Sequence, residues 1–195
     1  VELATEIHYE KGLAQALGIL GFTYIRISQH EEAQNYLDKS YELFTSLNDK
    51  HGQSDILEYY GIIQRSLGNL EASLDYLFKS LALAEKTDYK TTETQCLYHI
   101  GVSYRYLGKY DEALNYFLKS LDKARLINYS AVEGYCLNNI GLIYLETGDY
   151  TNAWLFVASW VTNGASLATL TTLDLFILNL GIIQRLLRIV AKAWP

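Results

Sequence analysis

The sequence predicts an all-α protein, a solenoid of stacked helix–turn–helix repeats. Two observations carry this prediction: glycines recur every 40 residues, and the 195-residue chain contains a single proline. Proline breaks helix interiors, so its scarcity fits long uninterrupted helices better than a fold rich in turns. The length can bury a sizeable core, which excludes intrinsic disorder and a disulfide-stapled miniprotein.

Equivalent residues form columns at the same spacing. One glycine column comprises Gly21, Gly61, Gly101, Gly141 and Gly181. A second glycine column comprises Gly68, Gly108 and Gly148, and an aromatic column comprises Tyr36, Tyr76, Tyr116 and Phe156. Several columns that share one spacing indicate a true repeat.

Each unit predicts two helices. In the third unit an apolar stripe with helical spacing comprises Leu97, Ile100, Tyr104 and Leu107. Gly108 then lies where a helix end favours a left-handed residue, and Asp111 and Glu112 suit the start of a second helix. The column of Gly101 lies inside the first helix, where glycine costs about 1 kcal/mol against alanine. A cost repeated in every unit predicts close packing of two helices there.

These residues resemble the tetratricopeptide repeat (TPR) family, in the longer-unit form of kinesin light chains and LGN/Pins-type adaptors. The matching segments are IGVSYRYLGKYDEALNYFLKSL and NNIGLIYLETGDYTNAW. The resemblance implies a right-handed superhelical solenoid, with residues 1–195 forming a single array. Its expected parts are the end of a preceding helix at 1–10, units at about 11–50, 51–90, 91–130 and 131–170, and a partial unit at 171–195. The opening VELATEIHYEKG resembles the tail of a helix, so we expect the sequence to be a piece of a longer chain.

The resemblance also implies a concave groove that holds an extended or helical peptide. The family's groove positions map onto Arg65, Tyr98, Arg105, Asn138 and Asn139. Arg65 and Arg105 share a column in adjacent units and suit an acidic side chain or a carboxylate. The two asparagines resemble an LNN element that binds a peptide backbone in adaptor relatives. The alternative is internal: the arginines pair with neighbours such as Glu58, and Asn139 serves internal packing.

The sequence contains no recognisable catalytic or metal-binding constellation. The four histidines are scattered without metal-ligand spacing, and His99 is expected to be a satisfied or solvent-facing ring. Cys96 and Cys136 share a column and are expected to be buried small hydrophobes. We therefore expect neither enzyme activity nor a cofactor. The net charge of −6 gives no case for nucleic acid or a membrane as partner. Two cysteines give no disulfide framework, so a natural chain is expected in the reducing cytoplasm.

Charge is unevenly distributed along the chain. Of the 38 charged side chains, 16 basic and 22 acidic, only four lie in residues 151–195, and residues 151–173 contain none. The register nevertheless continues, because GIIQR at 181–185 repeats GIIQR at 61–65. What changes is the residue type: Leu155, Trp160 and Leu173 occupy columns that hold Asn115, Ser120 and Glu133 one repeat earlier.

Three interpretations of this segment compete. A membrane span needs about 20 apolar residues in one helix, and Asn163-Gly164 interrupts the apolar run WLFVASWV. A terminal cap has a polar outer face, which this composition does not provide. We favour a self-association surface that makes a homodimer or a larger closed oligomer. Its candidate residues are Trp154, Leu155, Phe156, Trp160, Leu173, Leu175, Phe176 and Ile189. The alternatives are ordinary inter-repeat core for each residue, and an engineered chain whose C-terminal repeats were redesigned.

Overall fold

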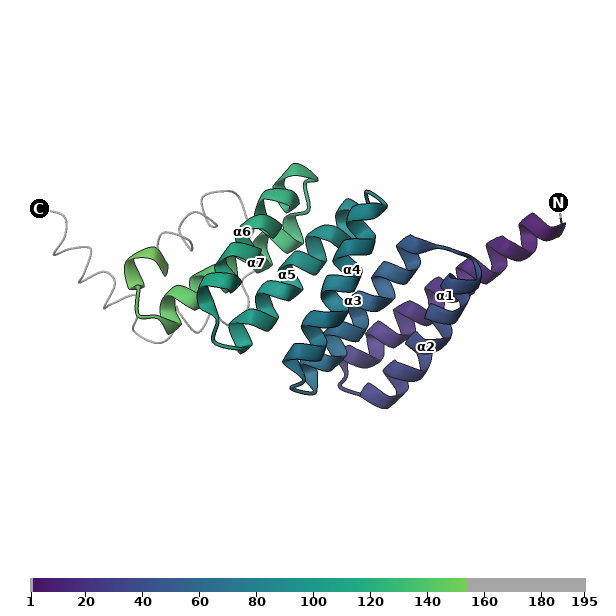
Figure 1. Ribbon diagram of the computed structural model, residues 1–195, viewed down its shortest axis with the longest axis horizontal. Coiled ribbons are helices and arrows are strands. Elements are labelled where there is room, and N and C mark those ends of the chain that lie inside the picture. The colour runs from purple at the N-terminus through teal and green to yellow at the C-terminus, as the bar shows by residue number, and fades with distance from the viewer. Residues whose placement is uncertain (1, 154–195) are drawn as a thin grey trace, which may run out of the picture. The chain divides into compact units, whose positions relative to one another are not determined.

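A computed structural model describes residues 2–153, with side chains from Tyr9 onward. Seven helices follow one another in this part of the chain (Figure 1). They are α1 (Glu2–Arg26), α2 (His30–Ser46), α3 (Lys50–Ser66), α4 (Leu70–Lys86), α5 (Lys90–Tyr106), α6 (Tyr110–Leu126) and α7 (Ser130–Glu146). A further helix begins at Tyr150, and the described residues contain no strand. The all-α prediction is confirmed.

The contacts group the chain into two compact units, residues 1–132 and residues 133–195. The first unit contains α1 to α6 and the first turn of α7. In the second unit the structure describes residues 133–153.

The turns between helices recur every 20 residues and share one backbone conformation. Each turn contains one residue with positive φ, at Ser28, Asn48, Gly68, Asp88, Gly108, Asn128 and Gly148. Glycine adopts this left-handed conformation without steric cost, and Asn and Asp tolerate it better than most residues. The residue that follows donates its N–H back into the helix, as Asp49 does to the Phe44 carbonyl at 2.9 Å. The predicted left-handed residue at Gly108, with φ of 71°, is confirmed.

The N-terminal residues differ from the expected repeat. Residues 2–10 continue directly into α1, whereas the repeat predicted the end of a preceding helix there. Asn48, Asp88 and Asn128 share a column and have positive φ. At the N-terminal end of the chain this column contains His8. The Asn or Asp that takes the left-handed conformation at the later turns is therefore missing at residue 8.

In the first unit the odd-numbered helices form one continuous face. Helix α1 contacts α3, and α3 contacts α5, whereas among the described residues of this unit α2 makes no contact with α4, nor α4 with α6. The stack is therefore tighter along the first helices of the repeats than along the second helices. We call the surface of α1, α3 and α5 the inner face.

Glycines allow the two helices of each repeat to approach closely. A Cβ atom at Gly21 would lie 2.5 Å from Leu37 Cδ2, one at Gly61 2.6 Å from Leu77 Cγ, and one at Gly101 2.8 Å from Phe117 Cδ1. The partner side chains Leu37, Leu77 and Phe117 are fully buried. The close packing predicted from the glycine column is confirmed in these three repeats.

Buried serines link the same helix pairs. The hydroxyls of Ser40, Ser80 and Ser120 are fully buried and donate to the carbonyls of Ala14, Ser54 and Thr94 at 2.7, 2.6 and 2.8 Å. Each serine thus satisfies its own hydroxyl inside the core and adds a bond between the second and first helices of one repeat.

Replacing Gly61 with Ala is expected to lower the free energy of unfolding, although Ala is the better helix former. The new Cβ would press on Leu77 Cγ at 2.6 Å and on the Ser73 carbonyl oxygen at 3.2 Å. Overpacking of this kind costs about 1–3 kcal/mol, whereas the gain in helix propensity is roughly 1 kcal/mol. Urea unfolding followed by circular dichroism measures the change.

Gly12→Ala is the matched control, because Gly12 lies inside α1 with nothing within 4 Å of the added Cβ. It is expected to stabilise the protein by roughly 1 kcal/mol. Equal stabilisation by the two substitutions would show that Gly61 is not required by close packing.

Candidate functional site

A polar cluster on the inner face joins α3 to α5. His99 Nε2 lies 3.2 Å from Glu58 Oε1. On the other side of the ring, Arg65 Nη2 lies 3.3 Å from His99 Nδ1, and Arg65 Nη1 donates to the His99 carbonyl at 3.4 Å. We call these three residues the Glu58–His99–Arg65 relay. Two of its members come from α3 and one from α5, so the relay connects the second repeat to the third.

Hydrogen-bonding capacity fixes the state of His99. The Arg65 guanidinium can only donate, so His99 Nδ1 must accept and carries no proton. The ring proton therefore lies on Nε2 and is donated to Glu58 Oε1. The pKa of His99 lies well below 6.5, because burial and the Arg65 charge both oppose protonation. His99 is thus a neutral bridge between an obligate donor and an acceptor.

Glu58 is the most deeply buried member of the relay. Only 2% of its surface is exposed, and this burial raises its pKa to about 8, with the Arg65 charge acting in the opposite direction. Oε1 accepts the bond from His99 whether the carboxyl group is ionised or protonated on its other oxygen. The relay therefore survives titration of Glu58.

A second polar link lies beside the relay. The Thr92 hydroxyl of α5 donates to Asp55 Oδ1 of α3. Burial raises the pKa of Asp55 to about 6, against the effect of the Thr92 bond, and nearby Glu58 adds to the rise. The junction of α3 with α5 therefore contains two carboxyl groups that are costly to ionise.

The five groove residues predicted from the sequence have different environments. Arg65 makes internal bonds to His99, which is the alternative interpretation in a modified form: His99 stands between the arginine and Glu58. Tyr98 is half-buried, with its ring 4.9 Å from His99 and 5.9 Å from Phe117. Arg105 is half-buried on α5, and its guanidinium lies 5.4 Å from the Tyr106 ring centre.

In the second unit the two asparagines also differ. Asn139 is 6% exposed and donates through Nδ2 to the Tyr135 carbonyl at 2.9 Å, one turn earlier in α7. Asn138 is half-buried. The side chain of Asn138 is thus more exposed than that of Asn139.

The eight residues predicted for self-association lie outside the described residues, but their repeat equivalents are described. The equivalents of Leu155, namely Asn35, Asp75 and Asn115, are exposed. By contrast, Ser120 in the column of Trp160 is fully buried, and Glu93 in the column of Leu173 is 4% exposed. Both columns are therefore buried in the third repeat, and the assignment of Trp160 and Leu173 to a self-association surface stays a prediction.

The remaining expectations concern cysteines, metals and membranes. Cys96 and Cys136 are both buried free thiols, as predicted. Burial raises the pKa of the Cys96 thiol well above its usual value. Within residues 2–153, no group of three His, Cys, Asp or Glu side chains is placed to hold a metal ion. In the same range no helix is long and apolar enough to cross a membrane.

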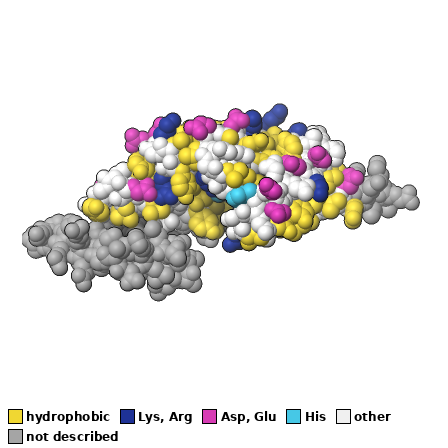
Figure 2. All heavy atoms as spheres, turned by 90° about the horizontal axis from the view of Figure 1, so that it is seen from below, with side chains coloured by type: hydrophobic (Ala, Val, Ile, Leu, Met, Phe, Trp, Pro, Cys, Tyr) yellow, Lys and Arg dark blue, Asp and Glu magenta, His cyan; other side chains and the backbone are white. Residues whose placement is uncertain are grey.

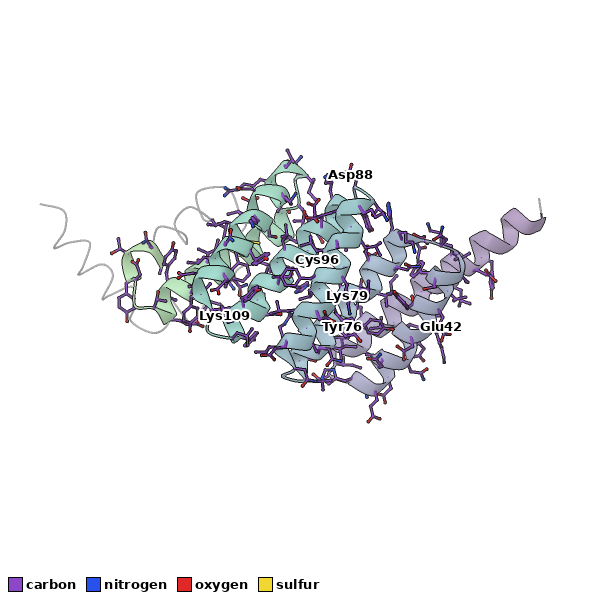
Figure 3. The ribbon with its side chains drawn as sticks, in the orientation of Figure 1. Glu42, Tyr76, Lys79, Asp88, Cys96 and Lys109 are labelled. Carbon is purple, nitrogen blue, oxygen red and sulfur yellow. The ribbon has the colours of Figure 1, made fainter. Side chains whose placement is uncertain are left out.

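The outer side of the stack carries a regular ladder of side chains. Lys39, Lys79 and Lys119 lie 5.3–5.9 Å from the ring centres of Tyr36, Tyr76 and Tyr116. Figure 3 labels Tyr76 and Lys79 on α4. On the face seen in Figure 2, charges of both signs alternate with hydrophobic side chains over the described residues. This mixture fits the absence of a strongly basic patch in the sequence.

Sequence reasoning missed two features of the inner face. It named Glu58 and His99 separately but not their bond, and it did not identify the Asp55–Thr92 pair. A usable signal existed in the columns, because Glu58 and His99 occupy neighbouring columns of successive repeats on first helices. Only polar residues that face each other across a repeat junction can make such bonds.

The fold of the described residues is that of a helical-repeat protein. The tetratricopeptide repeat family matches residues 12–86 and 93–153, and the chain belongs to this family. No curated protein sequence matches it.

Three solved structures share the fold at low sequence identity. Aspartyl phosphate phosphatase F from Bacillus subtilis has a TM-score of 0.72 at 16% identity, over 78% of this chain and 40% of its own. A Rap protein complexed with competence and sporulation factor has a TM-score of 0.72 at 18% identity, over 80% of this chain and 43% of its own. BtubC from P. vanneervenii has a TM-score of 0.63 at 16% identity, over 79% of this chain and 66% of its own. The chain thus spans about two fifths of the first two structures.

Replacing Glu58 with Gln is expected to stabilise the protein at pH 8. The folded protein holds the Glu58 proton up to a pKa of about 8, whereas the ordinary value is 4.5. Stability is therefore lost as the pH rises between these values. An amide stays neutral and still accepts the bond from His99. We expect a gain of at least about 1 kcal/mol at pH 8, the equivalent of roughly one pKa unit.

Urea unfolding at pH 5 and pH 8 measures the difference, and the variant should show the weaker loss of stability between them. Glu71→Gln, an exposed acid on α4, is the control and should follow the wild type. If Glu58→Gln and the wild type lose the same stability over this range, the buried carboxyl is not the cause.

Proposed function

We propose that this chain is a non-enzymatic scaffold that binds an extended peptide along the inner face. The observation that carries the proposal is the direct contact of α1 with α3 and of α3 with α5, which makes one continuous surface from three repeats. A peptide running across such a surface meets successive repeats at regular intervals.

The environments of the predicted residues refine the chemistry of this proposal. Arg65 donates its hydrogen bonds to His99 within the α3–α5 junction, so we assign it a role in holding the inner face together. Half-buried Tyr98 and Arg105 remain the candidates for direct contact in the first unit, and Asn138 in the second. Arg105 favours a carboxylate on the peptide. A Rap protein of the same fold was solved in complex with competence and sporulation factor, so this fold accepts a second molecule.

Arg105→Glu is expected to weaken the binding of acidic peptides. Immobilised acidic, neutral and basic peptides are probed with the purified chain, and affinities are measured by interferometry. The substitution removes a charge-assisted bond and adds repulsion, so the affinity for acidic peptides should fall at least about tenfold. This change corresponds to roughly 1.4 kcal/mol of binding free energy.

Lys119→Glu is the matched control. Lys119 is exposed on α6, so this substitution makes the same change of charge away from the inner face. It should leave peptide binding unchanged. Acidic peptides that bind Arg105→Glu as tightly as the wild type would contradict a role for Arg105, and failure of every peptide class to bind would contradict the peptide-binding proposal.

We propose self-association as a second function, through the apolar C-terminal residues named from the sequence. Its support is the absence of charge in residues 151–173 while the 40-residue register persists. Solenoids need a polar outer face at their ends, so an uncharged terminal repeat favours burial against a second copy. Leu155 is the strongest candidate, since its equivalents in three earlier repeats are exposed polar residues. This holds whether the terminal repeats are natural or redesigned.

Leu155→Glu is expected to convert a dimer into a monomer. Size-exclusion chromatography with light scattering measures the mass at micromolar concentration. A buried unpaired carboxylate at an interface costs several kcal/mol, which is enough to dissociate a modest dimer. Asn115→Glu places the same charge at the equivalent exposed position one repeat earlier and should not change the mass. A monomeric wild type would refute self-association.

A further inference from the structure

The junction between the second and third repeats differs from the junction before it. Across α1 and α3, Phe22 stacks on Tyr59 with ring centres 5.0 Å apart and Ile56 lies against Gly18, while Lys11 of α1 pairs with Asp49, the N-cap of α3, at 2.6 Å. Across α3 and α5 the contacts include the relay and the Asp55–Thr92 bond. The second junction therefore depends on groups that can take up protons.

We propose that His99 is a positioning residue whose protonation on Nδ1 loosens the junction between α3 and α5. We call the bonds between Arg65 and His99 the latch of this junction. In the neutral ring Nδ1 accepts from Arg65 and Nε2 donates to Glu58. A proton on Nδ1 turns the acceptor into a donor that faces the Arg65 Nη2 group at 3.3 Å. Two donors and two positive charges then meet, so the Arg65 side of the relay is lost.

The surroundings of His99 show where the change begins. From α3 the ring faces Glu58 and Arg65, and from its own helix it faces Tyr98 at 4.9 Å between ring centres. Asp55 and Tyr59 are further ionisable groups of α3, and the Glu58 charge acts on both of them. Burial and Arg65 hold the His99 pKa well below 6.5, which sets the transition in the acidic range. The bond from Nε2–H to Glu58 is retained, so the loosening of the junction begins at the Arg65 contact.

Release of Arg65 has a second consequence for the inner face. Its guanidinium also donates to the His99 carbonyl, and repulsion between the two positive charges weakens this bond as well. The arginine is then free to meet a carboxylate from outside. The latch itself does not rest on the proposed peptide binding, because it is defined by contacts within the chain.

The test uses Cys96 as an internal reporter of opening. Cys96 lies on α5 in the core, fully buried beside Ser80, and is labelled in Figure 3. The full chain is treated with 4,4′-dithiodipyridine, which reacts with thiols in acid, and the labelling rates of Cys96 and Cys136 are separated by mass spectrometry. Buried Cys136 in the second unit is the internal reference. We expect the ratio of Cys96 to Cys136 labelling to rise several-fold between pH 7.5 and pH 4.5.

Three variants decide the outcome. His99→Gln can accept from Arg65 and donate to Glu58 but takes no proton, so its ratio should stay constant with pH. His99→Lys carries a permanent charge and should give the high ratio at both pH values. His51→Gln removes an exposed histidine of the same unit and should behave as the wild type. An equal rise in the wild type and in His99→Gln would overturn the proposal, even if His99→Lys fails to fold.

Discussion

The close approach of two helices at each repeat glycine is the constraint on which the structure depends. Leu77 and Phe117 pack directly against the backbone of Gly61 and Gly101, at distances that leave no room for a Cβ atom. Each helix pair therefore forms a closely packed layer, and the buried clusters continue into the next helix. The buried hydroxyls of Ser80 and Ser120 stitch the same pairs together through backbone carbonyls. Neighbouring helix pairs can therefore stack only through the helix surfaces that are not already buried within a pair.

Stacking then decides which residues meet across a junction. Because α3 contacts both α1 and α5, its inner surface is shared between two neighbours. Toward α1 this surface offers Tyr59 and Ile56, and toward α5 it offers Glu58 and Arg65. The same fold thus contains an apolar junction beside a polar one. The difference lies in the side chains, since α3 and α5 have the same length of 17 residues.

The sequence predicted the helices, the turns and the glycine contacts because these features occur in every unit. A pattern that is present in several units is still recognised when one unit departs from it. Gly108 and the column of Gly101 both behave as predicted. The sequence could not separate surface from core in polar columns. Ser120 and Glu93 are polar yet buried, where Ser120 donates to a backbone carbonyl and Glu93 Oε1 pairs with Lys123. Nor could it predict the relay, which needs Glu58 and His99 to face each other across two repeats. Residue type alone does not encode that distance.

The relay also explains why an arginine on the inner face need not be a ligand-binding residue. A guanidinium has five donors, and inside a repeat stack they must be satisfied before the layers can close. Arg65 finds a ring nitrogen and a main-chain carbonyl, both on His99. The column equivalent in the first repeat is Ile25, which is buried and makes no such demand. Between the two junctions, Gly18, Ile25 and Tyr59 are replaced in their columns by Glu58, Arg65 and His99, and these three exchanges together introduce the chain of hydrogen bonds.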